Sequence, residues 1–360
     1  MKKRNSLIIA SVLVLGVLAL IVVLSRGQSS TIKQNYHVQD IASVSKIFMA
    51  DKLDNQVTLT RDKGDTTWTV NGEYEASLPM IELFLETLNE MRLREQVNKT
   101  AAPNVAKQLA SKSVKTEIYQ RVYRIDWFKH KLRLFPHEKK TSTLFIGHET
   151  QDMFGTYCYR EGDKVPVILY KPGLRGFIAP RFIADPLVWR SHRIVSLKVQ
   201  EIERVELEIP AAPEESFAIL RKGNGFEMEM LQTHQKVNGF DTARVAQLLS
   251  SFTNLNFDEY SQLVPKNERD TTFSKAPRTI LRVKDTKGNQ CELKTYIKYN
   301  NPDDIINMPD PEMYKIFDLD RLYAVLDAKD TVLIQYYVFD NILQPASFYL
   351  GQQKSSFAKQ

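Results

Sequence analysis

A pattern of strand, hairpin, helix and further strands occurs twice in this chain of 360 residues. The first copy opens with alternating apolar and polar residues in three segments, Val44–Met49, Gln56–Arg61 and Thr66–Val70. The second copy does the same in Ile202–Ile209, Phe217–Lys222 and Phe226–Met230. Such alternation is typical of strands with one buried face, and the short polar turns between the segments indicate hairpins. The repeat predicts two tandem copies of one folding unit.

Each copy continues with a segment whose apolar residues have helical spacing. In Met80–Leu93 these residues are Ile81, Leu85 and Leu88. In the second copy a helix is expected to begin at Thr242, with Asp241 as its N-cap, because a carboxylate there can accept the free N–H groups of the first turn.

The hairpins of the two copies align with three matched pairs, Leu59 with Leu220, Trp68 with Phe226, and Val70 with Met228. Further antiparallel strands are expected at Tyr123–Phe128, Lys131–Phe135 and Thr143–Gly147 in the first copy, and at Thr279–Val283 and Cys291–Ile297 in the second. We therefore expect an α+β fold, in which each unit is an antiparallel sheet with a packed helix.

An uncharged apolar run from Leu7 to Leu24 precedes both copies. As a helix it would be roughly 27 Å long, close to the hydrocarbon thickness of a bilayer. The run predicts a transmembrane anchor with Leu7, Leu13, Leu18 and Leu24 among its lipid-facing residues. The alternative is a cleaved signal peptide, which usually has a shorter apolar core.

Three cations at the N-terminal side of this run set its expected orientation, namely Lys2, Lys3 and Arg4. The positive-inside rule places them in the cytoplasm and the rest of the chain outside. The expected organisation is a cytoplasmic tip (1–6), an anchor (7–25), a linker (26–43), a first repeat (44–183), a connector (184–201), a second repeat (202–343) and a polar tail (344–360). The predicted location is the inner membrane, with a single span and a periplasmic bulk.

The charge does not indicate a nucleic-acid-binding protein, and the cysteine content does not settle whether a disulfide forms. The net charge is +6, but after the three N-terminal cations only 46 basic residues stand against 43 acidic ones. Such a balance is ordinary for a protein surface, so we expect no nucleic acid partner. Cys158 and Cys291 are the two cysteines, and the sequence leaves open whether they pair.

Motifs for common chemistries are missing from the sequence. It contains no P-loop, no G-x-S-x-G and no H-E-x-x-H, and the histidines His130, His137 and His148 follow no metal-binding spacing. Asn300–Asp304 is rich in metal-ligand types but lacks the order of a calcium loop, and turns use the same residues. We predict no catalytic residue, no metal site and no cofactor.

A basic and aromatic stretch from Arg121 to Lys140 is the most distinctive local feature. It could hold an anionic partner, and the residues proposed for that surface are Arg124, Lys129, Lys131 and Arg133. The alternative is an ordinary strand pair, in which aromatic side chains such as Tyr123 and Trp127 face the core and the charges face water.

The chain resembles a bacterial family known only as a domain of unknown function. The resemblance is carried by Leu59–Arg61 with Trp68–Val70, by Leu144–Glu149 with Gly155–Tyr157, by Trp189–Val205 and by the N-terminal apolar run. Some members of that family accompany auxiliary components of gliding-motility-type ABC transporters. The resemblance implies an association with transport and transfers no catalytic residue.

Three functions follow as expectations. The first is a membrane-anchored accessory or scaffold protein of a cell-envelope complex, with protein partners and, as the resemblance implies, a link to ABC-type transport. The second is an extracytoplasmic module that binds an anionic ligand such as a lipid headgroup or a glycan. The third is an envelope hydrolase, which only scattered histidines and aspartates support.

Overall fold

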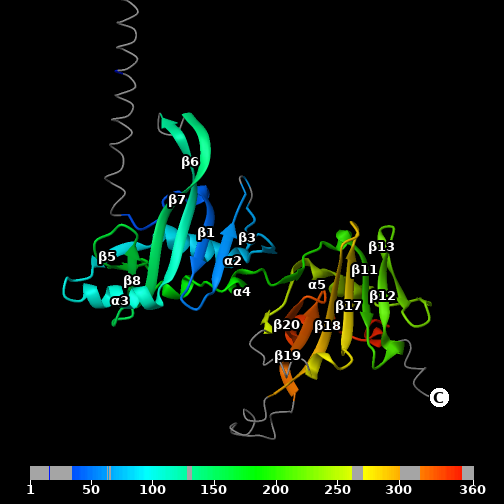
Figure 1. Ribbon diagram of the computed structural model, residues 1–360. Helices are drawn as coiled ribbons and strands as arrows, with labels where there is room; N and C mark the ends of the chain where they lie inside the picture. The colour runs from blue at the N-terminus through cyan, green and yellow to red at the C-terminus, as the bar shows by residue number, and fades with distance from the viewer. Residues whose placement is uncertain are drawn as a thin grey trace, which may run out of the picture. The chain divides into compact units, whose positions relative to one another are not determined.

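The computed structural model describes residues 35–62, 64, 66–127, 132–261, 271–300 and 317–350, together with Gly16. The chain divides between Ser191 and His192 into two compact units. Unit 1 contains the sheet strands β1 to β9, and unit 2 contains β11 to β14 and β16 to β20 (Figure 1).

The first unit is built on a nine-stranded antiparallel sheet with the order β4-β3-β2-β1-β6-β7-β8-β9-β5. Its elements are β1 (Val44–Ala50), β2 (Gln56–Thr60), β3 (Thr69–Val70), β4 (Tyr74–Glu75), α2 (Leu78–Glu90), β5 (Arg92–Gln96), α3 (Ala102–Lys112), β6 (Val114–Trp127), β7 (Leu132–Glu149), β8 (Thr156–Arg160), β9 (Val167–Tyr170) and α4 (Pro186–Trp189).

Two helices cover opposite faces of this sheet. The main core joins α2, through buried residues that include Phe84 and Leu88, to side chains such as Cys158 on β8. A second cluster joins Leu109 of α3 to Tyr157 and Tyr159, the neighbours of Cys158 on the same strand. Because successive residues of a strand point to opposite faces, α3 lies on the face that α2 leaves open.

The second unit repeats the plan, with a nine-stranded sheet in the order β14-β13-β12-β11-β17-β18-β19-β20-β16. Its elements are β10 (Arg193–Val195), β11 (Ile202–Glu208), β12 (Phe217–Lys222), β13 (Gly225–Met230), β14 (Lys236–Val237), α5 (Thr242–Ser251), β15 (Leu255–Asn256), β16 (Glu259–Tyr260), β17 (Thr279–Asp285), β18 (Gln290–Tyr299), β19 (Phe317–Leu326), β20 (Asp330–Gln335), α8 (Tyr336–Phe339) and α9 (Ala346–Tyr349).

The core of unit 2 lies under α5, whose buried residues are Val245, Leu248 and Leu249. The helix begins as expected, because the Asp241 carboxylate accepts hydrogen bonds from the backbone N–H groups of Ala243 and Arg244. Residues 346–349 of the expected polar tail form α9, and Tyr349 is buried against the ring of Phe217, with ring centroids 5.0 Å apart.

The two sheets match strand by strand, because β1 to β4 correspond to β11 to β14 and β6 to β9 correspond to β17 to β20. The register corrects one detail of the sequence alignment. Leu59 faces Val70 on the next strand, and Ile219 faces Met228 in the same way. The counterpart of Leu59 is therefore Ile219 and not Leu220, so the alignment was displaced by one residue at this strand.

The predicted α+β class is wrong. The described chain is mostly antiparallel β structure in two large sheets, and its helices of ten residues or more are α2, α3 and α5. The hairpin patterns were interpreted correctly, but the strands that follow each helix are longer than expected. Strand pairing, rather than helix packing, therefore dominates each unit.

The predictions of a transmembrane anchor, of a membrane span and of an inner-membrane location are also corrected. Among the described residues no helix is long and apolar enough to cross a membrane. A span needs about 20 apolar residues, whereas α2 has 13. The expected anchor residues Leu7, Leu13, Leu18 and Leu24, and the orientation residues Lys2, Lys3 and Arg4, lie outside the described part of the chain.

Candidate functional site

A two-stranded arm projects from the sheet of unit 1 (Figure 1). Strand β1 pairs with β6 only as far as Gln120, and β8 pairs with β7 only from Leu144 onward. Residues 121–127 and 132–138 therefore pair only with each other among the described strands. We call these residues the β6–β7 arm. Both outer edges of this ribbon are unpaired among the described strands.

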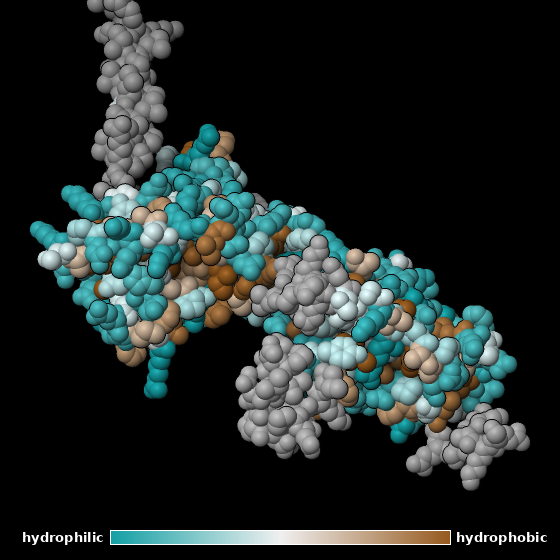
Figure 2. Space-filling model, turned by 60° about the horizontal axis from the view of Figure 1, so that its bottom comes forward, coloured by the Kyte–Doolittle hydropathy of each residue, from teal (hydrophilic) through white to brown (hydrophobic). Residues whose placement is uncertain are grey.

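Large apolar side chains are exposed on the β6–β7 arm, namely Trp127, Leu132, Leu134 and Phe135. Trp127 is directly opposite Leu132, and Ile125 is directly opposite Leu134. Residues opposite each other in an antiparallel pair lie on the same face and in contact. Ile125, Trp127, Leu132 and Leu134 thus form an apolar patch on one face of the arm, and Phe135 exposes a further apolar side chain next to it in the chain. The surface visible in Figure 2 is mainly hydrophilic.

Phe135 adds evidence that this patch has a role. Its backbone has a φ of 58°, in the left-handed region that bulky residues rarely adopt. Its side chain is 63% exposed, so burial within the described chain does not compensate for the strain. Strained residues of this kind concentrate at binding and active sites.

The structure places two of the four residues expected to form an anionic-partner surface on this arm, Arg124 and Arg133. Arg133 forms an ion pair with Asp126 at 3.8 Å, and its guanidinium carbon lies 5.3 Å from the centre of the Tyr123 ring. Arg124 is exposed, with no acidic partner among the described residues. Lys129 and Lys131 lie outside the described residues.

Sequence reasoning identified the basic residues here but missed the length of the hairpin. It expected separate short strands, whereas β6 and β7 have 14 and 18 residues. Leu132 and Leu134 alternate with Arg133, a pattern that normally indicates a face turned to the core. The signal that could have revealed the arm is the length of this alternation, which continues past the ends of the neighbouring strands.

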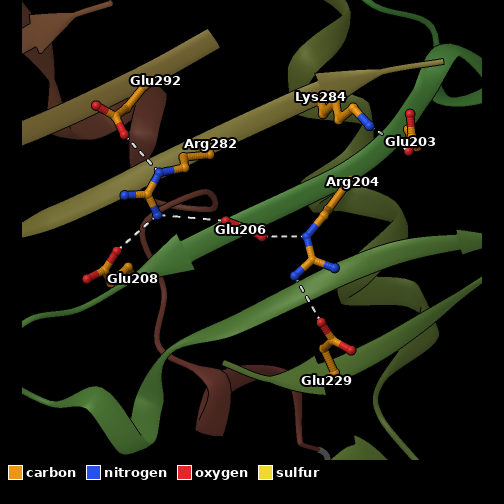
Figure 3. Close-up of polar contacts among 8 residues, drawn as sticks. All are labelled: Glu203, Arg204, Glu206, Glu208, Glu229, Arg282, Lys284 and Glu292. Carbon is orange, nitrogen blue, oxygen red and sulfur yellow. Dashed lines mark hydrogen bonds and ion pairs between the residues drawn. The ribbon is translucent and has the colours of Figure 1, made fainter. Parts of the chain in front are cut away.

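Unit 2 carries a dense set of ion pairs on its sheet, which we examined as a second candidate (Figure 3). Arg282 contacts Glu208 at 3.0 Å and Glu292 at 2.8 Å. Glu206 lies between Arg282 and Arg204, and Arg204 also contacts Glu229 at 2.9 Å. Every one of these charges has a partner within the sheet, so this set stabilises the sheet and has no free group for a ligand.

The corresponding place in unit 1 has the opposite charge. Glu117 on β6 lies opposite Phe48, the fifth residue of β1, and Arg282 on β17 lies opposite Glu206, the fifth residue of the matching strand β11. Burial disfavours the charge of Glu117, but hydrogen bonds from Lys115 and Tyr119 outweigh it and lower its pKa to about 2. Glu117 is therefore a structural carboxylate that stays ionised at neutral pH.

The described residues offer little for metal or acid–base chemistry. They contain no group of three or more His, Cys, Asp or Glu placed to hold a metal ion. His148 packs on the ring of Tyr157, with centroids 5.1 Å apart, and His137 lies on the exposed arm. His130 and residues 301–304 of the acidic loop lie outside the described chain.

No protein-family model, curated protein or solved structure matches this chain. The resemblance to a transporter-associated family therefore stays a prediction.

Proposed function

We propose that this chain is a non-catalytic accessory protein that binds a partner protein through the β6–β7 arm. The observation that carries the proposal is the set of exposed apolar side chains on a ribbon whose outer edges are unpaired among the described strands, with Trp127 44% and Phe135 63% exposed. Contiguous apolar patches on a protein surface typically mark interaction sites, and aromatic side chains commonly provide most of the binding energy.

Charge indicates what kind of surface the partner presents. Residues 121–140 contain seven basic and two acidic residues. A basic segment with exposed apolar side chains fits an acidic protein surface that contains an apolar recess. The predicted link to a transport complex is compatible with this role, and it rests only on the family resemblance.

Site-specific photocrosslinking tests the proposal. A photoreactive residue at Phe135 should capture one defined partner in cells. The same residue at Leu53, which is 81% exposed in the turn after β1, serves as a matched control and should not capture it. Replacing Trp127 by Ser should reduce the yield from position 135 by at least about tenfold, because a central aromatic anchor is typically worth 2 kcal/mol or more.

Two results would reject this function. One is equal capture from positions 135 and 53, and the other is a yield unaffected by Trp127→Ser. The alternative function, in which the arm holds a small anionic group of a lipid or a glycan, predicts a different outcome. Arg124→Glu with Arg133→Glu would then abolish binding, whereas Trp127→Ser would leave it nearly intact.

A further inference from the structure

A cleft of about 480 Å³ lies within unit 2, and none of the charged residues labelled in Figure 3 lines it. Three segments form it, the chain that follows β11, the chain that precedes β17 and the end of β18. Its lining residues are Ile209, Pro210, Ala211, Thr272, Lys275, Ala276, Pro277, Arg278, Tyr296, Ile297 and Tyr299. Its volume is within the range of sites that hold small molecules.

The charges of this cleft are all of one sign. Lys275 and Arg278 line it, and among the described residues no acidic side chain does. Unit 2 as a whole has the opposite excess, with 24 acidic and 21 basic residues after Ser191. Several other arginines of the unit have carboxylate partners, as Arg321 does with Asp258 at 2.9 Å. The two cations of the cleft have no carboxylate partner among the described residues.

Neutral aromatic groups, and not carboxylates, hold both cations in place. The Lys275 ammonium lies 5.0 Å from the centre of the Tyr299 ring. The guanidinium of Arg278 donates a hydrogen bond to the Tyr336 hydroxyl at 2.8 Å and lies 5.5 Å from the centre of that ring. Such contacts orient a cation without neutralising it, so its charge remains available to an anion.

The rest of the lining is mainly carbon. Tyr296 and Thr272 are buried, and proline, alanine and isoleucine side chains make up much of the remaining lining. An apolar wall favours an apolar ligand body, since removing such a body from water stabilises the complex by about 25 cal/mol per Å². Lys275 and Arg278 would bind its charged end.

We propose that this cleft binds a small amphiphilic anion, a molecule with an apolar body and a single carboxylate, sulfonate or phosphate group. This inference is independent of the β6–β7 arm and of the function proposed for it. The apolar lining provides the affinity for the ligand body, and Lys275 and Arg278 select for a negatively charged group.

Fluorescence titration of the full chain with anilinonaphthalene sulfonate tests the site, because this probe combines an aromatic body with one negative charge. Its uncharged analogue, N-phenylnaphthylamine, isolates the contribution of the charge. The variant with Lys275→Gln and Arg278→Gln should bind the sulfonate about tenfold more weakly, a loss of about 1.4 kcal/mol. It should bind the uncharged analogue as the wild type does.

A matched control removes the same net charge elsewhere in unit 2, with Lys222→Gln and Lys236→Gln on the β12–β14 strands, and should leave both affinities unchanged. Ala276→Trp should fill the cleft and weaken both probes. The proposal is overturned if the sulfonate does not bind saturably, if the control pair weakens it as much as the cleft pair, or if Ala276→Trp has no effect in a protein that unfolds like the wild type.

Discussion

Arg61 in unit 1 and Arg221 in unit 2 occupy the same position in their sheets and make the same two kinds of contact. Arg61 donates a hydrogen bond to the carbonyl oxygen of Val44 at 2.7 Å, and its guanidinium carbon lies 4.9 Å from the centre of the Trp68 ring. Arg221 donates to the carbonyl oxygen of Ile202 at 2.8 Å and lies 5.0 Å from the centre of its neighbouring aromatic ring, that of Phe226. Each arginine thus ties the start of the first strand to the hairpin that follows.

Replacing either arginine by Met should destabilise its own unit by about 2 kcal/mol, because backbone carbonyls would lose a charged donor. The three tryptophans, Trp68, Trp127 and Trp189, all belong to unit 1. In urea, Arg61→Met should therefore shift the unfolding transition that tryptophan fluorescence detects. Arg221→Met should shift only the transition detected by circular dichroism.

The exposed Arg124 provides the control for both variants. Arg124→Met should leave both transitions in place, because this side chain has no comparable set of acceptors. A shift of the fluorescence transition by Arg221→Met but not by Arg61→Met would contradict the assigned roles.

The ionised Glu117 makes stability depend on pH in the acid range. Its pKa in the folded chain is about 2, below its ordinary value of 4.5. A lowered folded-state pKa contributes stability that is fully present above the ordinary pKa and is lost as the pH falls toward 2. Glu117→Gln should therefore lower the free energy of unfolding by about 2 kcal/mol near neutral pH.

The difference between Glu117→Gln and the wild type should shrink as the pH falls from 4.5 toward 2, and urea titrations across that range measure it. Glu161→Gln removes a more exposed carboxylate that lies 3.8 Å from Lys140, and it should cost little at any pH. If Glu117→Gln lowered the free energy of unfolding by the same amount at every pH, the ionised carboxylate would not be the cause of the loss.

Short-range patterns predicted the repeated hairpins well. The segment Phe217–Lys222 was expected as a strand and forms β12 with the same bounds. The helix expected from Thr242 begins there, because Asp241 can satisfy two free N–H groups from a single side chain. These features depend on neighbours only a few residues away, so local sequence patterns are enough to predict where they begin and end.

Features that depend on distant partners could not be obtained in this way. The arm exists because β1 and β8 end before β6 and β7 do. The length of the alternation could have indicated a long hairpin, but it does not show where the neighbouring strands stop. The displaced match of Leu59 with Leu220 has the same origin, since register is fixed by pairing across the sheet. Tyr349 is buried although it belongs to the segment that was expected to be a polar tail, because its packing partner Phe217 lies far away in the sequence, on β12.

Gly147 tests how closely α3 packs on its sheet. A Cβ at this position would overlap Cδ2 of Leu109 and lie 3.3 Å from the carbonyl oxygen of Tyr157. Because Leu109 is buried and cannot move freely, Gly147→Ala should destabilise unit 1 by about 1–3 kcal/mol. The fluorescence-detected urea transition reports the loss.

A second substitution identifies the cause of that loss. Leu109→Ala removes the overlapping atoms, so the double variant should be less destabilised than the sum of the two single variants. If the destabilisation of the double variant equalled the sum of the two single variants, the strand conformation, and not the contact with α3, would account for the destabilisation by Gly147→Ala.

Both cysteines are free, and their surroundings suppress their reactivity. Burial raises the pKa of Cys158, and burial together with Asp327 raises that of Cys291 to about 12. Only a thiolate attacks a disulfide reagent, so the folded chain should not react with dithiobis-nitrobenzoate at about pH 8. In urea the two thiols should react fully, and Cys291→Ser should leave one. If the wild-type chain showed no reactive thiol in urea until a reductant was added, the cysteines would be paired. Because Cys158 belongs to unit 1 and Cys291 to unit 2, such a disulfide would link two chains or the two units of one chain.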